Sequence, residues 1–253
     1  MSINNLELKN YLDGVLRAKE ISDYCPNGLQ VEGTGKIKKI VTGVTASQAL
    51  VDAAIDADAD AIIVHHGYFW KGESQTITGM KKRRLSALLT NNINLYAYHL
   101  PLDVHPEFGN NRQLASLLGI QDIHAVSHVK PIGVVMQGTL EDETDGVTLQ
   151  STLQQILKRD VLLEGPTSKP ITTLAWCTGG GQGFIEQAVE RGVDAFITGE
   201  VSEQTVHTAR EMGITFLAAG HHATERYGVK SLGEHIAEHF DVTVEFIDID
   251  NPA

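Results

Sequence analysis

Two stretches decide the fold of this chain: Ala59-Asp60-Ala61-Ile62-Ile63 and Val193-Asp194-Ala195-Phe196-Ile197. Each contains an aspartate followed by a short apolar run of the kind found in buried parallel strands. A second pair of apolar runs, 93–98 and 214–219, follows in the same order. The chain is therefore predicted to contain an internal repeat, in which the connecting segments differ in length while the elements persist.

Apolar runs alternate with amphipathic segments throughout both halves. The expected strands cover residues 38–45, 61–64, 93–98, 172–177, 195–198, 214–219 and 242–247. The expected helices cover residues 5–21, 48–58, 80–91, 110–118, 148–158, 183–191, 202–212 and 230–240. This order predicts an α/β fold, made of two similar α/β halves with mostly parallel sheets covered by helices.

A more polar segment separates the two halves, with an acidic run at 141–145 and a Gly165-Pro166 break. We predict a first α/β half at 1–125, a bridging insert at 126–170 and a second α/β half at 171–253. Nothing in the composition resembles a flexible linker, so the three segments are expected to form one compact unit.

Composition narrows the possible functions. The 253 residues are 42% hydrophobic, and 32 acidic against 20 basic residues give a net charge of −12. This charge repels phosphates, so a nucleic-acid or anionic-membrane partner is not expected. The basic cluster Lys81–Arg84 is typical of a solvated helix turn, or alternatively of a contact for an anionic substrate or a neighbouring subunit.

The chain shows no signal-peptide pattern and no apolar run of about 20 residues that could span a bilayer. We therefore expect a soluble, cytoplasmic protein. Its two cysteines, Cys25 and Cys177, are too few for a disulfide framework and are expected to be structural.

Imidazole and carboxylate groups follow three of the expected strands. His65-His66 closes the run 61–64, His99 and Asp103 follow the run 93–98, and His221 and Glu225 follow the run 214–219. Ligands of open α/β sheets bind beyond the carboxyl ends of the strands, and a spacing of four places two side chains on one side of a helical turn. Nitrogen and oxygen donors together suit a metal site, and more than four donors suggest two ions with a water between them as nucleophile.

Two further motifs have simpler alternatives. His235-Ile236-Ala237-Glu238-His239 fits a short zinc-protease pattern but lies in an expected helix without an obvious third ligand, so an exposed helix is the preferred interpretation. Gly179, Gly180 and Gly181 separate a strand from a helix and could contact an anion, or could simply form a tight turn.

The sequence resembles the family of GTP cyclohydrolase 1 type 2 homologues, also called Nif-three-like proteins, in its short bacterial form. The resemblance covers nearly the whole chain. It is carried by residues 27–31, 42–45, 63–67, 99–103, 109–111, 175–181, 194–200 and 220–225.

The resemblance implies a site for two divalent metal ions and a ring-shaped homohexamer. The residues that match the family's metal ligands are His65, His66, Asp103, His221 and Glu225. His99 matches a position beside the metals and is expected to handle protons or support a ligand, whereas a ligand role for His222 stays open. The donor types suit Zn²⁺, Fe²⁺ or Mn²⁺ alike.

The leading functional hypothesis is a dinuclear metal-dependent hydrolase that acts on a small polar or nucleotide-like molecule. The family resemblance suggests ring opening of the GTP cyclohydrolase type. The alternative is a non-enzymatic assembly that handles metal ions or docks a protein partner, because the sequence contains no nucleophilic triad, dinucleotide fingerprint or P-loop.

Overall fold

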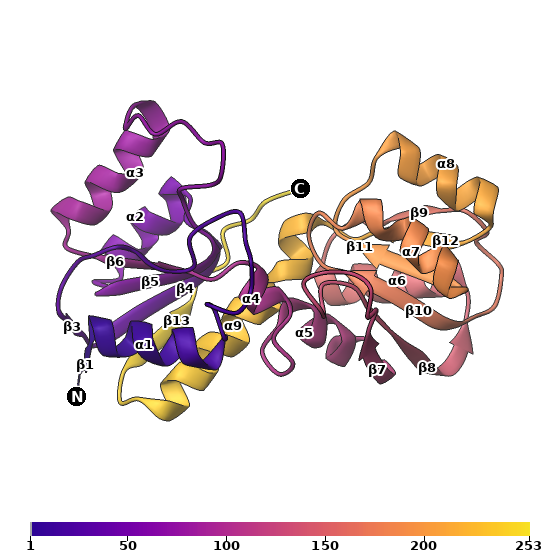
Figure 1. The fold of residues 1–253 in the computed structure, drawn as a ribbon, viewed down its shortest axis with the longest axis horizontal. Helices are drawn as coiled ribbons and strands as arrows, with labels where there is room; N and C mark the ends of the chain where they lie inside the picture. Colours follow the sequence, from indigo (N-terminus) through magenta and orange to yellow (C-terminus); the bar gives the residue numbers. More distant parts are fainter. Residues whose placement is uncertain (1) are drawn as a thin grey trace. The chain divides into compact units, whose positions relative to one another are not determined.

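The computed structural model describes residues 2–253 and divides the chain into two compact units. The first unit comprises the chain up to Leu102 together with Gly228–Asp250, and the second comprises Asp103–Tyr227 together with Asn251–Ala253. Both are α/β, as predicted (Figure 1). Within residues 2–253, no helix combines the length and apolar character needed to cross a membrane.

The first unit is built on a five-stranded sheet in the order β13-β4-β5-β6-β2. Strands β13 (Thr243–Phe246), β4 (Lys39–Thr45), β5 (Ala61–His66) and β6 (Asn94–Ala97) are parallel, and β2 (Gly28–Val31) is an antiparallel edge. A separate two-residue ladder joins β1 (Ile3–Asn4) to β3 (Lys36–Ile37).

Helices cover both faces of this sheet (Figure 1). One face carries α2 (Gln48–Asp56) and α3 (Gly79–Thr90), whose leucines pack on alternate residues of the central strands. The other carries α1 (Asn5–Val15) and the last part of α9 (His221–His239). Helix α2 begins where the sequence predicts, because the Ser47 hydroxyl accepts a hydrogen bond from the N–H of Leu50 at 3.2 Å.

The second unit is built on a six-stranded mixed sheet in the order β7-β8-β10-β11-β12-β9. Its centre is parallel, with β10 (Ile171–Cys177), β11 (Ala195–Thr198) and β12 (Thr215–Ala218). The outer strands β7 (Gln121–Ala125), β8 (Met136–Thr144) and β9 (Leu162–Glu164) are antiparallel. The first part of α9 and the short helix α4 (Leu100–Asp103) also contribute residues to this unit.

Two helical layers enclose the second sheet. Helices α5 (Asn110–Leu117) and α6 (Gly146–Leu157) share one apolar core with it. Helices α7 (Ile185–Arg191) and α8 (Glu203–Met212) share the other, after a 3-10 turn at Gln182–Phe184. Each unit therefore buries both faces of its sheet, which explains the continuous apolar runs of its central strands.

The internal repeat is visible in the hydrogen bonds of two aspartates. In the first unit, the N–H of Lys39 donates to Asp60 Oδ2 at 3.0 Å. In the second, the N–H of Thr173 donates to Asp194 Oδ2 at 3.0 Å. Each aspartate precedes a buried strand and ties the beginning of the neighbouring strand to it, so the two repeated stretches have the same structural role.

Some elements differ from the sequence prediction. Much of the expected insert 126–170 is part of the second sheet, because β8 and β9 pair with β10 and β12. The final strand, β13, pairs instead with β4 in the first unit. Helix α9 begins at His221 rather than at residue 230, directly after Gly220, whose φ of +96° is a conformation that favours glycine.

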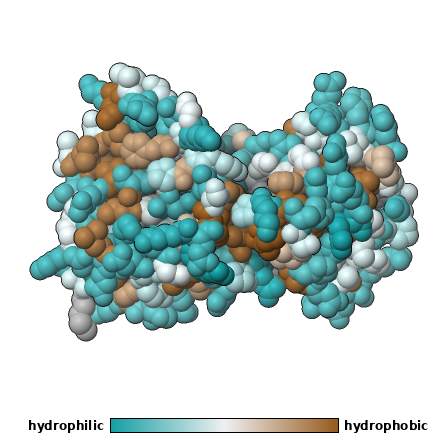
Figure 2. All heavy atoms as spheres, in the orientation of Figure 1, coloured by the Kyte–Doolittle hydropathy of each residue, from teal (hydrophilic) through white to brown (hydrophobic). Residues whose placement is uncertain are grey.

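Hydrophilic side chains cover most of both units on the face shown in Figure 2, where hydrophobic residues appear in patches. This surface agrees with the charged composition of the chain.

Candidate metal centre

Three imidazoles converge at the carboxyl edge of the first sheet. His65 and His66 are the last two residues of β5, and His99 follows β6 two positions after its end. The ring centroid of His65 lies 4.5 Å from that of His66 and 5.0 Å from that of His99. One ring nitrogen from each histidine lies within 4.8 Å of the other two, which is close enough for a shared cation.

The Nδ1 atoms of the adjacent histidines face protein oxygen atoms. His65 Nδ1 lies 3.0 Å from the carbonyl oxygen of Tyr98, and His66 Nδ1 lies 3.2 Å from the hydroxyl of Thr45. A carbonyl oxygen only accepts hydrogen bonds, so Nδ1 of His65 is the donor and Nε2 is the nitrogen that could bind a metal ion. Metal-binding histidines are held in the same way, with the second nitrogen donating to a protein oxygen.

His99 is held by a carboxylate, Asp23, that no sequence motif indicated. Its Nδ1 lies 2.9 Å from Asp23 Oδ1, while Asp23 Oδ2 accepts hydrogen bonds from the N–H of Leu100 at 2.9 Å and the amide of Asn27 at 3.0 Å. Burial alone would raise the pKa of Asp23, but the hydrogen bonds from His99, Asn27 and Leu100 lower it to about 2. Asp23 is therefore charged and fixes the orientation of the His99 ring.

The second unit presents a group rich in carboxylates. His221 and Glu225 are one turn apart at the start of α9, with Nε2 of His221 3.3 Å from Oε2 of Glu225. His221 Nδ1 lies 2.7 Å from Oε1 of Glu200, which follows β11. Burial lowers the pKa of His221, but hydrogen bonds and charge interactions with Glu225 and Glu200 outweigh it and raise the pKa to about 9.

Asp103 belongs to the same unit and ends helix α4. It is buried, and its Oδ1 accepts a hydrogen bond from the side-chain amide of Asn110 at 2.8 Å. Burial and the charges of Asp103 and Glu225 raise the pKa of the Cys177 thiol. Cys177 is the last residue of β10, so both carboxylates lie near the carboxyl end of this strand. Such a group of buried carboxylates attracts cations and repels anions.

The glycine loop is shaped by these same residues. A side chain at Gly179 would collide with the Glu225 carboxylate. The N–H of Gly179 donates to Thr224 at 3.0 Å, and the N–H of Gly181 donates to Thr198 at 3.1 Å. These contacts favour the tight-turn alternative, because an anion on Gly179, Gly180 and Gly181 would compete for N–H groups that donate to threonine hydroxyls.

Three other residues or motifs have local partners. His222 is buried, and its N–H donates to the carbonyl of Ala253 at 3.2 Å. Lys81 of the basic cluster forms an ion pair with Glu73 at 3.4 Å. In the zinc-protease-like pattern, His235 Nε2 lies 2.6 Å from the Tyr11 hydroxyl and its ring stacks on Tyr11, which agrees with a structural role.

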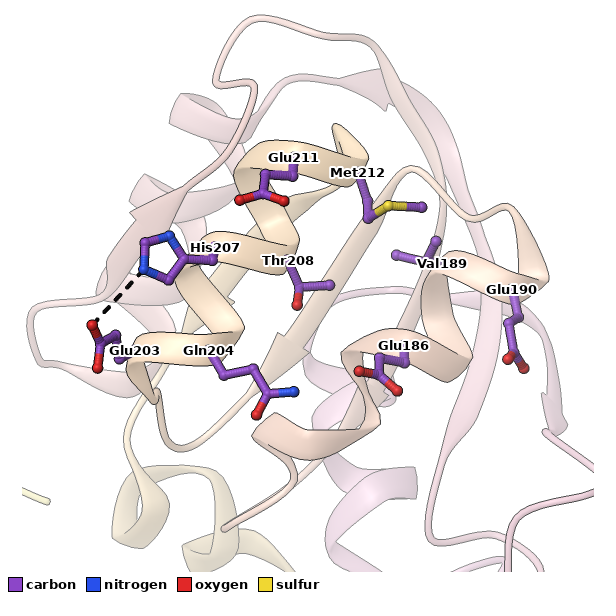
Figure 3. A pocket seen from close by; sticks show the side chains of 9 residues that line it. All are labelled: Glu186, Val189, Glu190, Glu203, Gln204, His207, Thr208, Glu211 and Met212. Carbon is purple, nitrogen blue, oxygen red and sulfur yellow. Dashed lines mark ion pairs between the residues drawn. The ribbon is translucent and has the colours of Figure 1, made fainter.

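A groove lies in the second unit between α7 and α8 (Figure 3). None of the predicted metal ligands lines it. Its walls are Glu186, Val189, Glu190, Glu203, Gln204, His207, Thr208, Glu211 and Met212. Four carboxylates on these walls oppose the binding of a phosphate-bearing molecule, so the groove does not suit a nucleotide.

Comparison with known proteins connects these features to a family. The family model described as Duf34/NIF3 (NGG1p interacting factor 3) matches residues 3–252. Proteins named GTP cyclohydrolase 1 type 2 homolog, from Pasteurella multocida (strain Pm70) and Escherichia coli (strain K12), are each 56% identical over 252 residues. The alignments cover 99% of this chain and 100% of either relative.

Solved structures show the same fold. The structure of protein ybgI, described as of unknown function, superposes with a TM-score of 0.94 at 55% identity. The crystal structure of TTHA1606 from Thermus thermophilus superposes with a TM-score of 0.91 at 34% identity. Both comparisons cover 99% of this chain and 100% of the other.

Proposed function

We propose that this chain, which belongs to the Duf34/NIF3 family, binds two divalent metal ions and hydrolyses a nucleotide-like small molecule. The name of its relatives, GTP cyclohydrolase 1 type 2 homolog, suggests opening of a purine-type ring. The proposed metal ligands are His65, His66, Asp103, His221 and Glu225.

The main support is the way in which the three proposed imidazole ligands are held. Nδ1 of each faces a protein oxygen atom, which is the Tyr98 carbonyl, the Thr45 hydroxyl or the Glu200 carboxylate. This arrangement leaves Nε2 of each ring as the nitrogen that would bind a metal ion, and the partner oxygen raises the basicity of such a ligand.

The donor set fits divalent cations. The proposed ligands combine the imidazole nitrogens of three histidines with the carboxylate oxygens of Asp103 and Glu225, both of which are buried. Two such cations, when bound, would supply Lewis acidity and lower the pKa of a bound water, which is the chemistry that hydrolysis of an unreactive ring requires.

The chain itself supplies a group to move protons. The charged Asp23 holds Nδ1 of His99, which leaves Nε2 as the atom that can take or release a proton. This pairing resembles the carboxylate–imidazole pairs of acid–base catalysis, in which the carboxylate fixes the tautomer of the ring. His99 is therefore assigned the proton-handling role, with Asp23 as its positioning residue.

The test combines metal analysis with turnover. Purified protein loaded with Zn²⁺, Fe²⁺ or Mn²⁺ is assayed on a panel of nucleotides, in parallel with His65→Ala, Glu225→Ala and the exposed control His207→Ala. We expect about two ions per chain and turnover in the wild type and the control, and loss of both in the two site variants. Turnover that survives both site substitutions would show that the activity arises elsewhere.

The carboxylates around His221 also favour a second candidate function, the transport or storage of metal ions. Metal exchange distinguishes the two. A carrier should lose its ions rapidly to a competing chelator. A catalytic site should retain its ions over many turnovers.

The homohexamer expected from the family resemblance is part of the proposal. Light scattering of the purified protein should give six times the mass of one chain.

A further inference from the structure

Two aromatic side chains flank His99 in the first unit, and the proposed function gives them no role. The ring of Tyr24 lies 5.4 Å from that of His99, and the ring of Trp70 lies 4.9 Å from it. Both approach His99 edge-on, at interplanar angles of 61° and 84°. Their own centroids are 6.5 Å apart, so the two rings form one continuous surface, here called the aromatic wall.

The aromatic wall is open to solvent. Tyr24 is 53% exposed, and Trp70 is only half-buried. The other tryptophan, Trp176, is fully buried and donates its indole N–H to the carbonyl of Asn111 at 2.9 Å. Core packing therefore accounts for Trp176, but it does not require an exposed tyrosine and a half-buried tryptophan beside a histidine cluster.

The protein holds the wall in place without a ligand. The N–H of Lys71 donates to the carbonyl of Tyr24 at 2.7 Å, which ties the two loops together. The indole N–H of Trp70 donates to the carbonyl of Gly67 at 3.2 Å, which fixes the ring. A ligand that binds such a prearranged surface loses little affinity to the ordering of side chains.

We propose that Tyr24 and Trp70 bind the planar aromatic ring of the substrate by stacking and hold it beside His99. Every heteroaromatic ring has a π-face, so a wall of two aromatic side chains stacks on a planar ring more strongly than on a charged, non-planar sugar phosphate. The inference rests on the proposed function, because it places the stacked ring next to the group assigned to proton transfer. It names the substrate class as planar heterocycles.

The test measures ring binding apart from metal binding and turnover. Guanosine, which has a planar ring, is compared with ribose 5-phosphate, which has none. Binding is followed by equilibrium dialysis and by quenching of tryptophan fluorescence. Trp176 is fully buried, so ligand contact is reported by Trp70.

We expect guanosine to bind and quench, and ribose 5-phosphate to do neither. Tyr24→Leu and Trp70→Leu should each weaken guanosine binding roughly tenfold. The control is Phe69→Leu, because Phe69 is an exposed aromatic residue of the same loop that lies under Lys81 instead of beside His99. Its affinity for guanosine should equal that of the wild type, and thermal melting checks that each variant is folded.

Equal affinity for the two probes, or an unchanged guanosine affinity in folded Tyr24→Leu, overturns the inference. The His65→Ala variant separates this failure from failure of the proposed function. That variant should lose metal and turnover but keep guanosine binding. Loss of guanosine binding in it would show that the ring is held by the metal site and not by the aromatic wall.

Discussion

Replacing Asp23 by asparagine tests the most detailed electrostatic feature of the site. The side chain is only 2% exposed, and its pKa is lowered from 3.8 to about 2 by the hydrogen bonds of His99, Asn27 and Leu100, which outweigh the effect of burial. Each unit of pKa corresponds to about 1.4 kcal/mol, so the charged form of Asp23 stabilises the folded state by roughly 2 kcal/mol.

The sign of the pH dependence follows from the direction of the pKa change. The folded-state pKa lies below the unfolded value, so the stabilisation is complete above about pH 4 and is lost as the pH falls toward 2. Asp23→Asn should therefore lower the free energy of unfolding by roughly 2 kcal/mol at pH 7, and the difference from the wild type should shrink steadily below about pH 4.

Urea unfolding of both proteins at a series of pH values measures this difference, with the exposed Asp52→Asn on α2 as the control. The control should differ little from the wild type at any pH, because Asp52 is exposed and accepts its hydrogen bond from Gln48 on the surface of the same helix. A difference in unfolding free energy between wild type and Asp23→Asn that stays constant down to about pH 2 would contradict this expectation. It would mean that shape rather than charge makes Asp23 stabilising.

Three further predictions address the site and its surroundings. Glu200→Gln should weaken metal binding about 10- to 100-fold in a chelator competition, because the Nδ1 partner of His221 loses its charge, whereas Glu203→Gln should leave it unchanged. Gly179→Ala should lower the melting temperature by several degrees and reduce metal content, whereas Gly180→Ala, with no atom closer than 3.7 Å, should melt like the wild type. The Cys25 thiol should react with a disulfide reagent at about pH 8 only after unfolding in urea, because burial raises its pKa to about 12. Rapid reaction of Cys25 in the native protein would contradict this prediction.

The sequence predicted the parts of the fold that depend on local pattern. The apolar runs after Asp60 and Asp194 are buried strands, and the four-residue spacing of His221 and Glu225 places both on one side of a helix. These features depend on the period of side chains along the chain, which can be read without knowing what packs against them.

Long-range pairing could not be predicted in this way. The alternation in Thr243–Phe246 fits the edge of either sheet, and only packing assigns this strand to β4. Asp23 and Glu200 were missed for a related reason. Their hydrogen bonds to His99 and His221 join residues 76 and 21 positions apart, and a lone carboxylate in a loop carries no periodic pattern.

The two repeated aspartates affect which positions of such a protein can change during evolution. Asp60 and Asp194 bind at the amino ends of their strands, whereas His65-His66 and Gly199-Glu200 lie at the opposite ends. Strand register is therefore anchored at one edge of each sheet, and reactive side chains are carried at the other. Mutation can exchange ligands at the second edge without disturbing the pairing of the strands, so one ancestral unit could give rise to two copies with different chemistry.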